Sequence, residues 1–513
     1  MISSILQSAK RIISERKMNV INHPSSIKKK WQGNKKKVTV ITAVYNAEEY
    51  IENTIRSVIN QTIGFDEIEY IIVDDCSTDR TNEIVKSYTQ QYPNICLVTL
   101  GSNTGSPGTP RNIGVQLATA KYVTFLDADD WFAEDGIERL YSILEETGDD
   151  YVVGKTVKYT SDTDTAVVGE FASVEERRSI TPFAVPHFFY HMGPTARLIK
   201  LSLLKENEIG FPDIKFGEDK LFFSDVFFHA NTVSTTTWPI YFVNRKPENS
   251  GSLTRVTDVL TKRRADLEVI RYIMEKQLPI EKEKAALTRI YEYDIVKTFD
   301  SQLFVKSDKK EEFIDILRQA MEMAKDLRYD ILAEFKTPFY RRAVDLFMEG
   351  RIDDLINLFV WLKQEKNKHF AIKDGLPYYE VPLFTDNYRF IRVPMFARAL
   401  DSYVINDVFH QMFEVYGEDI DNINSILIRD RKRFDNEIVC PFKLDGNFGS
   451  FKIPLEQLDA LEDSLFTIFI RYNEYQLLNI KRILKNHISH NGRKVEFYTT
   501  KVNNLGLLLA RQE

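Results

Sequence analysis

Ile71-Ile72-Val73-Asp74-Asp75-Cys76-Ser77-Thr78-Asp79 decides the fold of this chain, because it joins an apolar run to an acidic end. The stretch Phe125-Leu126-Asp127-Ala128-Asp129-Asp130 repeats that combination about fifty residues later. Each apolar run predicts a buried strand, and each set of acids follows the carboxyl end of its strand. Ligands of open α/β sheets bind in the crevice outside those ends. The two stretches therefore predict one shared ligand site.

The segments around these two stretches alternate between strand and helix patterns. The predicted elements are strands at 38–44, 70–73, 95–100 and 122–126 and helices at 47–61, 79–91 and 111–119. Strands that alternate with helices form a parallel sheet with right-handed crossovers. The predicted fold class is therefore α/β, with a Rossmann-like nucleotide-binding domain in the first half of the chain.

The later parts of the chain show other patterns. Residues 150–255 mix short strands with loops, and one helix is expected near 220–230. Amphipathic helices dominate residues 256–370, with examples at 309–327 and 343–359. These patterns predict that a helical part follows the α/β domain.

From about residue 376 the apolar residues alternate along short runs. The clearest runs are 425–429, 437–442 and 466–470, with Asp445-Gly446 as a turn signal between them. This pattern is typical of a small β-sandwich. The predicted organisation is a basic amphipathic arm (1–36), an α/β domain (37–255), a helical linker domain (256–375) and a β-rich, sandwich-like domain (376–513).

Composition excludes several classes of protein. The 513 residues are 43% hydrophobic and 12% aromatic, which is enough for packed cores, and the net charge of −7 gives no nucleic-acid signature. The three cysteines show neither metal-ligand spacing nor a disulfide framework, and no apolar run reaches the roughly 20 residues that cross a bilayer. A cytoplasmic protein that binds no nucleic acid is expected, either free or peripheral at the inner face of the membrane.

The N-terminal arm is basic although the whole chain is acidic. Residues 1–37 carry ten Lys and Arg against one Glu, and residues 1–17 place apolar side chains at helical spacing. Lysine runs at 28–30 and 35–37 would each add attraction to anionic lipid, worth roughly 1 kcal/mol per charge near the surface. Two interpretations remain open, a helix lying on the membrane surface and a helix packed on protein.

Two common nucleotide motifs are absent. The sequence contains no P-loop, and Gly101, Gly105 and Gly108 do not make the dinucleotide-binding pattern. Those glycines fit a structural turn, or a loop that cradles a phosphate. A nucleotide site would therefore depend on the acidic stretches.

The acids themselves suit a metal-bound diphosphate. Asp127 and Asp129 are alternate residues after a strand and can direct two carboxylates at one hard cation such as Mg²⁺ or Mn²⁺. Asp75 can accept a hydrogen bond from a base or a ribose, while Ser77 or Asp79 caps the next helix. In the loop expected at 217–220, Glu218-Asp219 fits either a general base or a helix cap.

Taken together, these stretches resemble the family 2 (GT-A) glycosyltransferases over roughly residues 37–255. The segments that carry the resemblance are Val44–Glu48, Val73–Asp79, Asn103–Asn112, Asp127–Asp130 and Glu218–Phe222. The Gly-x-Pro-Arg-Asn and Glu-Asp-x-Leu-Phe segments look most like the wall teichoic acid and capsule glycosyltransferases of Gram-positive bacteria. The helical linker and the C-terminal sandwich are similar too, which implies that the C-terminal domain forms a homo-oligomer.

The resemblance implies a role for each matching residue. The implied uridine and donor-sugar contacts are Val44, Tyr45, Glu48, Asp75, Asn103, Arg111 and Asp127. Asp129 would coordinate Mn²⁺ or Mg²⁺ against the diphosphate, and Asp219 would be the catalytic base with Glu218 beside it. Arg245 and Ser250 match the family's phosphate-contacting loop only loosely, because the usual histidine is missing.

The hypothesis is an inverting, metal-dependent enzyme that moves GlcNAc or another hexose from a UDP-sugar to a hydroxyl of a cell-surface polymer such as teichoic acid. A capsule or exopolysaccharide transferase acting on a lipid-linked repeat is an alternative. A nucleotidyltransferase would need a basic, glycine-rich loop where Val44-Tyr45-Asn46 stands, and a binding protein with an inactive domain would have lost Asp129 or Asp219. The C-terminal aromatic residues fit either a core or a carbohydrate platform.

Overall fold

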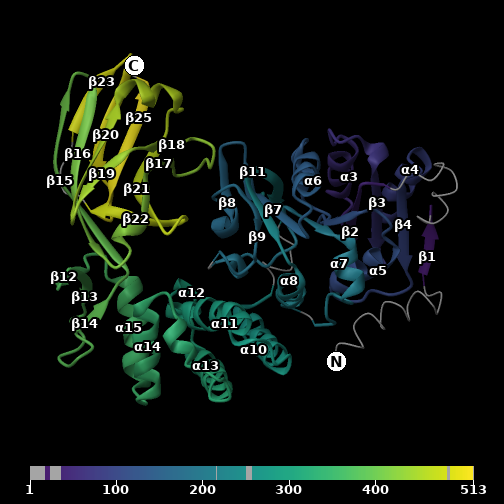
Figure 1. Ribbon diagram of the computed structural model, residues 1–513, viewed down its shortest axis with the longest axis horizontal. Coiled ribbons are helices and arrows are strands. Elements are labelled where there is room, and N and C mark those ends of the chain that lie inside the picture. The colour runs from purple at the N-terminus through teal and green to yellow at the C-terminus, as the bar shows by residue number, and fades with distance from the viewer. Residues whose placement is uncertain are drawn as a thin grey trace. The chain divides into compact units, whose positions relative to one another are not determined.

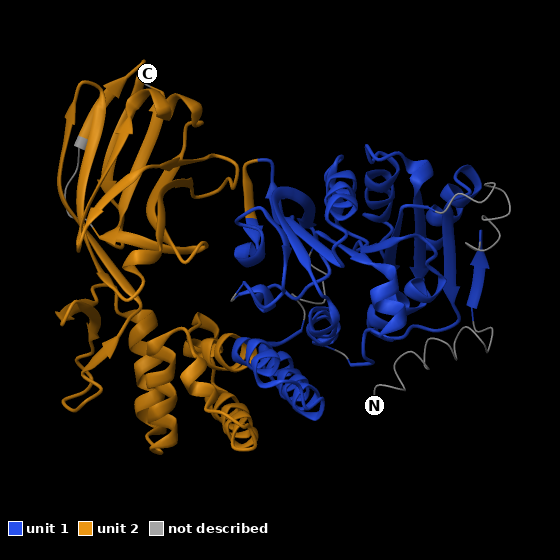
Figure 2. Ribbon diagram, viewed as in Figure 1, with its two compact units in different colours: residues 1–162, 167–289 blue, residues 163–166, 290–513 orange. Residues whose placement is uncertain are grey.

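The computed structural model describes residues 18–22, 36–185, 187–214, 216–249, 257–481 and 486–511. The chain forms two compact units, one of residues 1–162 and 167–289 and the other of residues 163–166 and 290–513 (Figure 2). Helices α10 (Val259–Glu275) and α11 (Ile280–Thr288) group with the first unit, although the sequence pattern assigned them to a separate linker. The four-part division therefore stays a prediction.

Four parallel strands form the first half of the sheet in the first unit (Figure 1). They are β2 (Val38–Val44), β3 (Ile68–Asp74), β4 (Ile95–Leu100) and β5 (Tyr122–Phe125). Strand β2 pairs in parallel with β3 and β5, and β3 pairs in parallel with β4. The predicted α/β class is confirmed, and Asp75 and Asp127 follow the carboxyl ends of two strands on either side of β2.

The second half of this sheet is mixed. Its strands are β6 (Trp131–Phe132), β7 (Tyr151–Ser161), β10 (Arg197–Lys200) and β11 (Val233–Asn244), while β8 (Asp164–Val168) and β9 (Arg177–Ile180) lie off the main order. Strand β10 runs antiparallel to β5 and β7, and β11 runs parallel to β7. The sheet therefore changes from parallel to mixed beside β5, next to the second acidic stretch.

Strand β1 (Met18–Ile21) was not expected from the sequence. It pairs antiparallel with β4 at one edge of the sheet. The rest of the predicted basic arm, residues 1–17 and 23–35, lies outside the described residues. Four residues within that arm therefore belong to the sheet.

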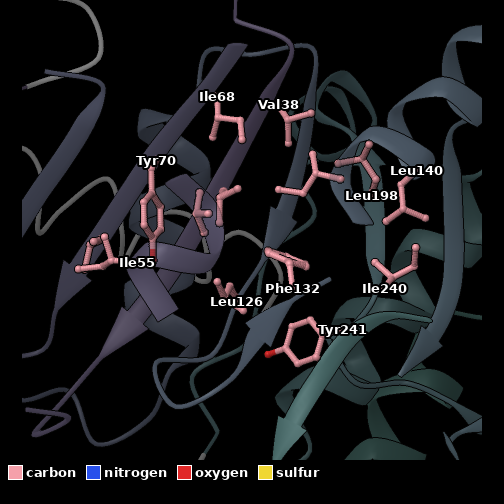
Figure 3. Packing of buried hydrophobic residues seen from close by; sticks show 14 of the residues in the cluster. Val38, Ile55, Ile68, Tyr70, Leu126, Phe132, Leu140, Leu198, Ile240 and Tyr241 are labelled. Atoms are coloured by element: carbon pink, nitrogen blue, oxygen red, sulfur yellow. The ribbon is translucent and has the colours of Figure 1, made fainter. Parts of the chain in front are cut away.

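Helices cover both faces of the sheet, because alternate side chains of a buried strand point to opposite faces. Besides α10 and α11, the helices of this unit are α3 (Ile51–Ile59), α4 (Thr81–Gln91), α5 (Gly108–Leu117), α6 (Gly136–Thr147), α7 (Leu201–Glu206) and α8 (Glu218–His229). On one face, Val38 and Val40 join a core with Ile55 of α3 and Leu140 of α6 (Figure 3). On the other face, Ile41 packs against Gly114 of α5, so that a Cβ at Gly114 would lie 2.5 Å from Ile41 Cγ2.

The second unit begins with helices. They are α12 (Gln302–Lys306), α13 (Lys310–Ala324), α14 (Pro338–Met348) and α15 (Ile352–Gln364). The single helix predicted at 343–359 was wrong, because Gly350 adopts a positive φ of 75° and separates α14 from α15. Glycine takes this left-handed conformation without the steric cost that a side chain would bring.

The remainder of the second unit is rich in strands. A small sheet contains β12 (His369–Lys373), β13 (Leu376–Glu380) and β14 (Phe390–Arg392). The larger sheet contains β15 (Met395–Ile405), β16 (Val408–Gly417), β17 (Ile423–Asp430), β18 (Glu437–Cys440), β19 (Phe442–Asp445), β20 (Phe448–Pro454), β21 (Leu465–Tyr472), β22 (Gln476–Lys481), β23 (Asn486–His490), β24 (Arg493–Thr499) and β25 (Leu505–Arg511). Phe413 and Phe451 share one core cluster with Ile428 and Ile468. The sheet-rich C-terminal domain is thereby confirmed.

One strand boundary differs from its prediction. The run 437–442 is divided at Pro441 into β18 and β19, which pair with different neighbours, β17 and β20. Proline has no N–H to donate to a ladder and is therefore placed between strands. Among the described residues, no helix is long and apolar enough to cross a bilayer.

Candidate active site

Arg111 joins two of the predicted site residues. From α5, its guanidinium donates one hydrogen bond to Asp219 Oδ1 at 2.9 Å and another to Asp127 Oδ1 at 2.8 Å. Its side chain is only 5% exposed, and the guanidinium also lies 5.2 Å from the centre of the Phe211 ring. Residues from three separate parts of the sequence therefore meet at one buried cation.

The charge of Arg111 is maintained by its neighbours. Burial alone would lower the pKa of the guanidinium, but the carboxylates of Asp219 and Asp127 outweigh burial and raise it. A planar guanidinium can serve two carboxylates at once, because its donors point in fixed directions. The bridge therefore holds the two acids at defined positions.

Glu218 and Asp219 lie in the first turn of α8 and not in a loop, so the predicted loop was wrong. Gly217, with φ of 90°, precedes the helix in the left-handed conformation. Burial, followed by the nearby charge of Asp219, raises the pKa of Glu218 to about 7. Burial likewise raises the pKa of Asp219, against the opposing effect of Arg111. A carboxylate with a raised pKa suits proton transfer near neutral pH.

Lys220 connects the first turn of α8 to a neighbouring helix. Its ammonium pairs with Asp266 of α10, which is fully buried and also lies 3.0 Å from Arg263 Nε. Burial lowers the pKa of Lys220 to about 7, and Asp266 opposes that effect. The first turn of α8 is therefore attached to α10, a helix of the same unit.

Asp75 lies under the loop that follows β4. It is 5% exposed, and its carboxylate accepts hydrogen bonds from the Thr104 N–H at 2.9 and 3.1 Å and from the Thr104 hydroxyl at 2.9 Å. Burial raises the pKa of Asp75, while the bonds from Thr104 oppose the shift. Each carboxylate oxygen can accept more than one hydrogen bond, so contact of Asp75 with uridine stays a prediction.

The loop after β2 is tied to the segment after β3. The Asp75 N–H donates to the Val44 carbonyl at 2.8 Å, and Glu48 Oε2 accepts from Arg80 N at 3.0 Å and Arg80 Nε at 3.1 Å. Val44 is buried, whereas Tyr45 is 48% exposed. Of these predicted nucleotide contacts, Tyr45 therefore offers the most accessible side chain.

Asp79 lies just before α4, and its Oδ1 accepts a hydrogen bond from the N–H of Thr81, the first residue of the helix, at 3.0 Å, while the N-cap position is Arg80. Ser77 accepts instead from the Asn46 N–H at 3.0 Å and connects the two loops. Asn103, an exposed residue, accepts from the Gly105 N–H at 2.6 Å and shapes the next loop. Contact between Asn103 and the nucleotide is not tested by this geometry.

Asp130 anchors the second acidic stretch to the end of β11. It is 2% exposed, and its two oxygens accept from the Asn244 N–H at 2.7 Å and the Tyr241 hydroxyl at 2.9 Å. The Tyr241 hydroxyl in turn accepts from the Asp127 N–H at 3.0 Å. Sequence reasoning missed Tyr241, because nothing in its local pattern shows a partner more than a hundred residues away.

Asp129 has a partner that sequence reasoning also missed. Asn249 Nδ2 donates to Asp129 Oδ2 at 2.5 Å. Burial raises the pKa of Asp129, and the bond from Asn249 opposes that shift. Asn249 precedes Ser250, which lies outside the described residues, while Arg245 donates to the Asn244 and Tyr159 carbonyls. The segment after β11 is therefore the neighbour of the Asp-x-Asp pair.

The acids could hold a metal only with help from a ligand. No group of three or more His, Cys, Asp and Glu within the described ranges could hold an ion. Asp127 and Asp129 supply oxygen atoms, which suit Mg²⁺ or Mn²⁺, and a diphosphate and water would have to complete the coordination.

Solved structures share this architecture. The crystal structure of Staphylococcus aureus TarS matches 93% of this chain and 86% of its own with a TM-score of 0.57 at 20% identity. TarS 1–349 in complex with UDP-GlcNAc matches 69% of this chain and 99% of its own with a TM-score of 0.56 at 22% identity. A mixed α/β domain of the GT-A-like class, followed by a helical and sheet-rich part, is therefore the shared fold.

The family follows from the sequence comparison. Residues 39–206 match the model described as Glycosyl transferase family 2, and this segment of the chain belongs to that family. The match covers β2 to α7, including Arg111 and Asp127, and ends before Asp219.

Curated relatives act in teichoic acid synthesis. The poly(ribitol-phosphate) beta-N-acetylglucosaminyltransferases TarS (strain Mu50) and TarP (strain N315) of Staphylococcus aureus are 27% identical over 356 residues and 30% identical over 227 residues. The alignment with TarS covers 66% of this chain and 58% of TarS. The alignment with TarP covers 42% of this chain and 66% of TarP. The poly(ribitol-phosphate) beta-glucosyltransferase of Bacillus spizizenii is 31% identical over 39% of this chain and 31% of its own length. The chain thus spans about a third to two thirds of these relatives.

The raised pKa of Glu218 predicts a pH-dependent stability. Between about pH 4.5 and 7 the unfolded state releases this proton first, so the free energy of unfolding falls as pH rises through that window. Glu218→Gln removes the charge. We expect this variant to raise the free energy of unfolding at pH 8 by on the order of 1–3 kcal/mol, and the melting temperature should rise with it. At pH 4.5 the two proteins should have the same stability, because Glu218 is then protonated in the folded state. Melting curves of both proteins across this range measure it.

The exposed Glu206 provides the matched control, because Glu206→Gln makes the same chemical change on the surface. We expect no gain in melting temperature at pH 8 from that variant. If the melting temperature of Glu218→Gln rises equally at pH 4.5 and pH 8, packing and not charge accounts for the added stability.

Proposed function

We propose that this chain is an inverting glycosyltransferase that moves a hexose or N-acetylhexosamine from a UDP-sugar to a hydroxyl of a cell-surface polymer such as teichoic acid. The observation that carries the proposal is the Arg111 bridge between Asp127 and Asp219 at the carboxyl edge of the parallel strands. The family match covers two of these three residues. The names of TarS and TarP support the polymer class.

Asp219 is the proposed catalytic base. Its side chain remains 29% exposed although Arg111 binds one of its oxygens, so an acceptor hydroxyl can approach. As the acceptor oxygen forms a bond to C1 of the sugar, its proton passes to the Asp219 carboxylate. The bond from C1 to the UDP oxygen breaks, and UDP leaves with the electron pair.

Attack occurs on the face of C1 opposite the leaving group, so the anomeric centre inverts in a single displacement. One base is sufficient, in contrast to the two carboxylates of glycoside hydrolases. Arg111 keeps Asp219 in place for this attack and positions Asp127 beside the donor. Glu218 is buried next to Asp219 in the first turn of α8, where it would contact the donor or the acceptor.

Asp129 and Asp127 are the proposed protein ligands of Mg²⁺ or Mn²⁺. Their hard oxygen atoms fit such an ion, and a bound ion would neutralise charge that builds on the departing diphosphate. Asn249 holds one oxygen of Asp129. Tyr45, Glu48, Asp75, Asn103 and the Val44 backbone form the proposed uridine side of the site.

The location and assembly are proposed from composition. The amphipathic, basic arm at 1–36 would contact anionic lipid at the inner face of the membrane, and the chain would otherwise be cytoplasmic. The sheet-rich domain at 376–513 would form a homo-oligomer.

The function is tested by UDP release from UDP-GlcNAc, UDP-GalNAc, UDP-glucose and UDP-galactose with Mn²⁺. Each donor is measured with and without poly(ribitol phosphate) or poly(glycerol phosphate). We expect one donor to release UDP, with stimulation by one polymer and loss of release in Asp129→Ala. If no pair releases UDP, but a donor binds by calorimetry, the acceptor is a different one, such as a lipid-linked repeat. If no UDP-sugar binds, the proposal is wrong.

Asp219→Asn separates binding from transfer. The amide keeps the shape of the side chain but cannot take the acceptor proton, so we expect donor binding within about threefold of wild type and a transfer rate at least about 10²-fold lower. Calorimetry with UDP-sugar and single-turnover kinetics measure the two quantities. A variant that transfers at the wild-type rate would remove Asp219 from the role of base.

A further inference from the structure

A cavity of 880 Å³ lies wholly within the second unit, in a different unit from the acidic site. Helical residues and strand residues contribute to its wall. They include Tyr340 of α14, Leu362 of α15, Phe370 of β12, Arg398 of β15 and Lys481 of β22. Neither the proposed reaction nor the family segment at 39–206 involves this cavity.

Three lysines give the cavity a net positive charge. Lys366, Lys368 and Lys481 line it, and none of them forms an ion pair in the part of the chain that the structure describes. The other charged groups of the wall are largely neutralised, since Asp300 pairs with Lys363 at 2.6 Å and Arg398 pairs with Glu414 at 2.6 Å. Asp401 is exposed.

Neutral groups hold two of these lysines in place. Lys481 Nζ donates to Asn504 Oδ1 at 2.8 Å and to the Val502 carbonyl at 3.2 Å, and Lys368 Nζ donates to the Glu365 carbonyl at 2.6 Å. Burial, followed by the charge of Lys368, lowers the pKa of Lys481. Both lysines line the same cavity, so an anion bound there would be attracted by two ammonium groups.

Aromatic rings form another part of the wall. The Phe370 ring lies 4.3 Å from the Phe396 ring and 5.0 Å from the Tyr379 ring, and the Phe339 ring lies 6.1 Å from the Tyr379 ring. Such a surface packs against the C–H groups of sugars and polyols, while neighbouring cations bind phosphate. The volume is that of a site for a sizeable ligand and exceeds what one phosphate needs.

We propose that this cavity binds a segment of an anionic polyol-phosphate chain, with phosphates at Lys368 and Lys481 and the polyol carbons against the aromatic rings. This inference rests on the proposed function, because it takes the bound polyol-phosphate to be the acceptor polymer of that reaction. A polymer held by the second unit is presented to the catalytic unit of the same protein at a raised effective concentration. The cavity would then determine the preference for long over short acceptors.

The experiment measures binding of fluorescent poly(ribitol phosphate), poly(glycerol phosphate) and uncharged dextran to the full chain at low salt. We expect both phosphate polymers to bind and dextran not to bind. The double variant Lys368→Gln/Lys481→Gln should bind the preferred polymer about tenfold more weakly, because two phosphate contacts are lost. The exposed Lys366 gives a second variant, Lys366→Gln, which does not disturb packing and should weaken binding about threefold.

Lys443 and Lys452, two exposed lysines of β19 and β20, provide the matched control. Lys443→Gln/Lys452→Gln removes the same charge, and we expect its polymer affinity within about twofold of wild type. Binding of UDP and the melting temperature should be the same in all variants.

Three outcomes overturn the inference: no polymer binding by wild type, equal weakening in the control and cavity variants, or unchanged binding in both Lys368→Gln/Lys481→Gln and Lys366→Gln. Polymer binding that depends on the cavity lysines, in a protein that neither binds a UDP-sugar nor releases UDP, would refute the proposed function and leave this site intact. UDP release that a polymer stimulates equally in all variants, with unchanged polymer binding, would support the proposed function and refute the polymer site in the cavity.

Discussion

The catalytic unit depends on one buried cation. Arg111, almost excluded from solvent, holds Asp127 and Asp219, which would otherwise repel each other. A buried charge is stable only when it is paired and hydrogen-bonded, so the cation and the two acids require one another. The helix that carries Arg111 is fixed by the close contact of Gly114 with Ile41, and the turn that carries Asp219 is fixed by Lys220 and Asp266. The geometry of the site is thus a consequence of how α5 and α8 are packed.

A second layer of contacts determines where the acids of the Asp-x-Asp stretch lie. Asp130 is 2% exposed, and both of its oxygens bind groups at the end of β11. This leaves Asp127 and Asp129 as the members that can meet a ligand. Three adjacent carboxylates therefore have different surroundings and different tasks. Burial raises the pKa of Asp130 well above its usual value, in keeping with a group that is isolated from solvent.

Local patterns predicted much of the fold. Apolar runs that end in acids located β3 and β5, and the predicted limits of β2 and β4 match the structure. The break between α14 and α15 was missed because the apolar spacing continues across Gly350, and β1 was missed because a strand of four residues carries little periodicity. For the site, family resemblance proposed Arg111, Asp127 and Asp219, which the fold brings together. Tyr241, Asn249 and Asp266 could not be found, because their relevance lies in contacts between distant parts of the chain.

The role of the Arg111 bridge is tested most directly by the single-turnover rate constant of Arg111→Lys at saturating UDP-sugar and acceptor. Lysine keeps the positive charge, but its ammonium is a point charge that cannot serve two carboxylates in the fixed fork that a guanidinium provides. If the bridge positions the base, the rate constant falls by about 10²-fold or more while the protein stays folded. A folded Arg111→Lys protein that reacts at the wild-type rate would show that charge alone is sufficient, and it would contradict the positioning role of the bridge.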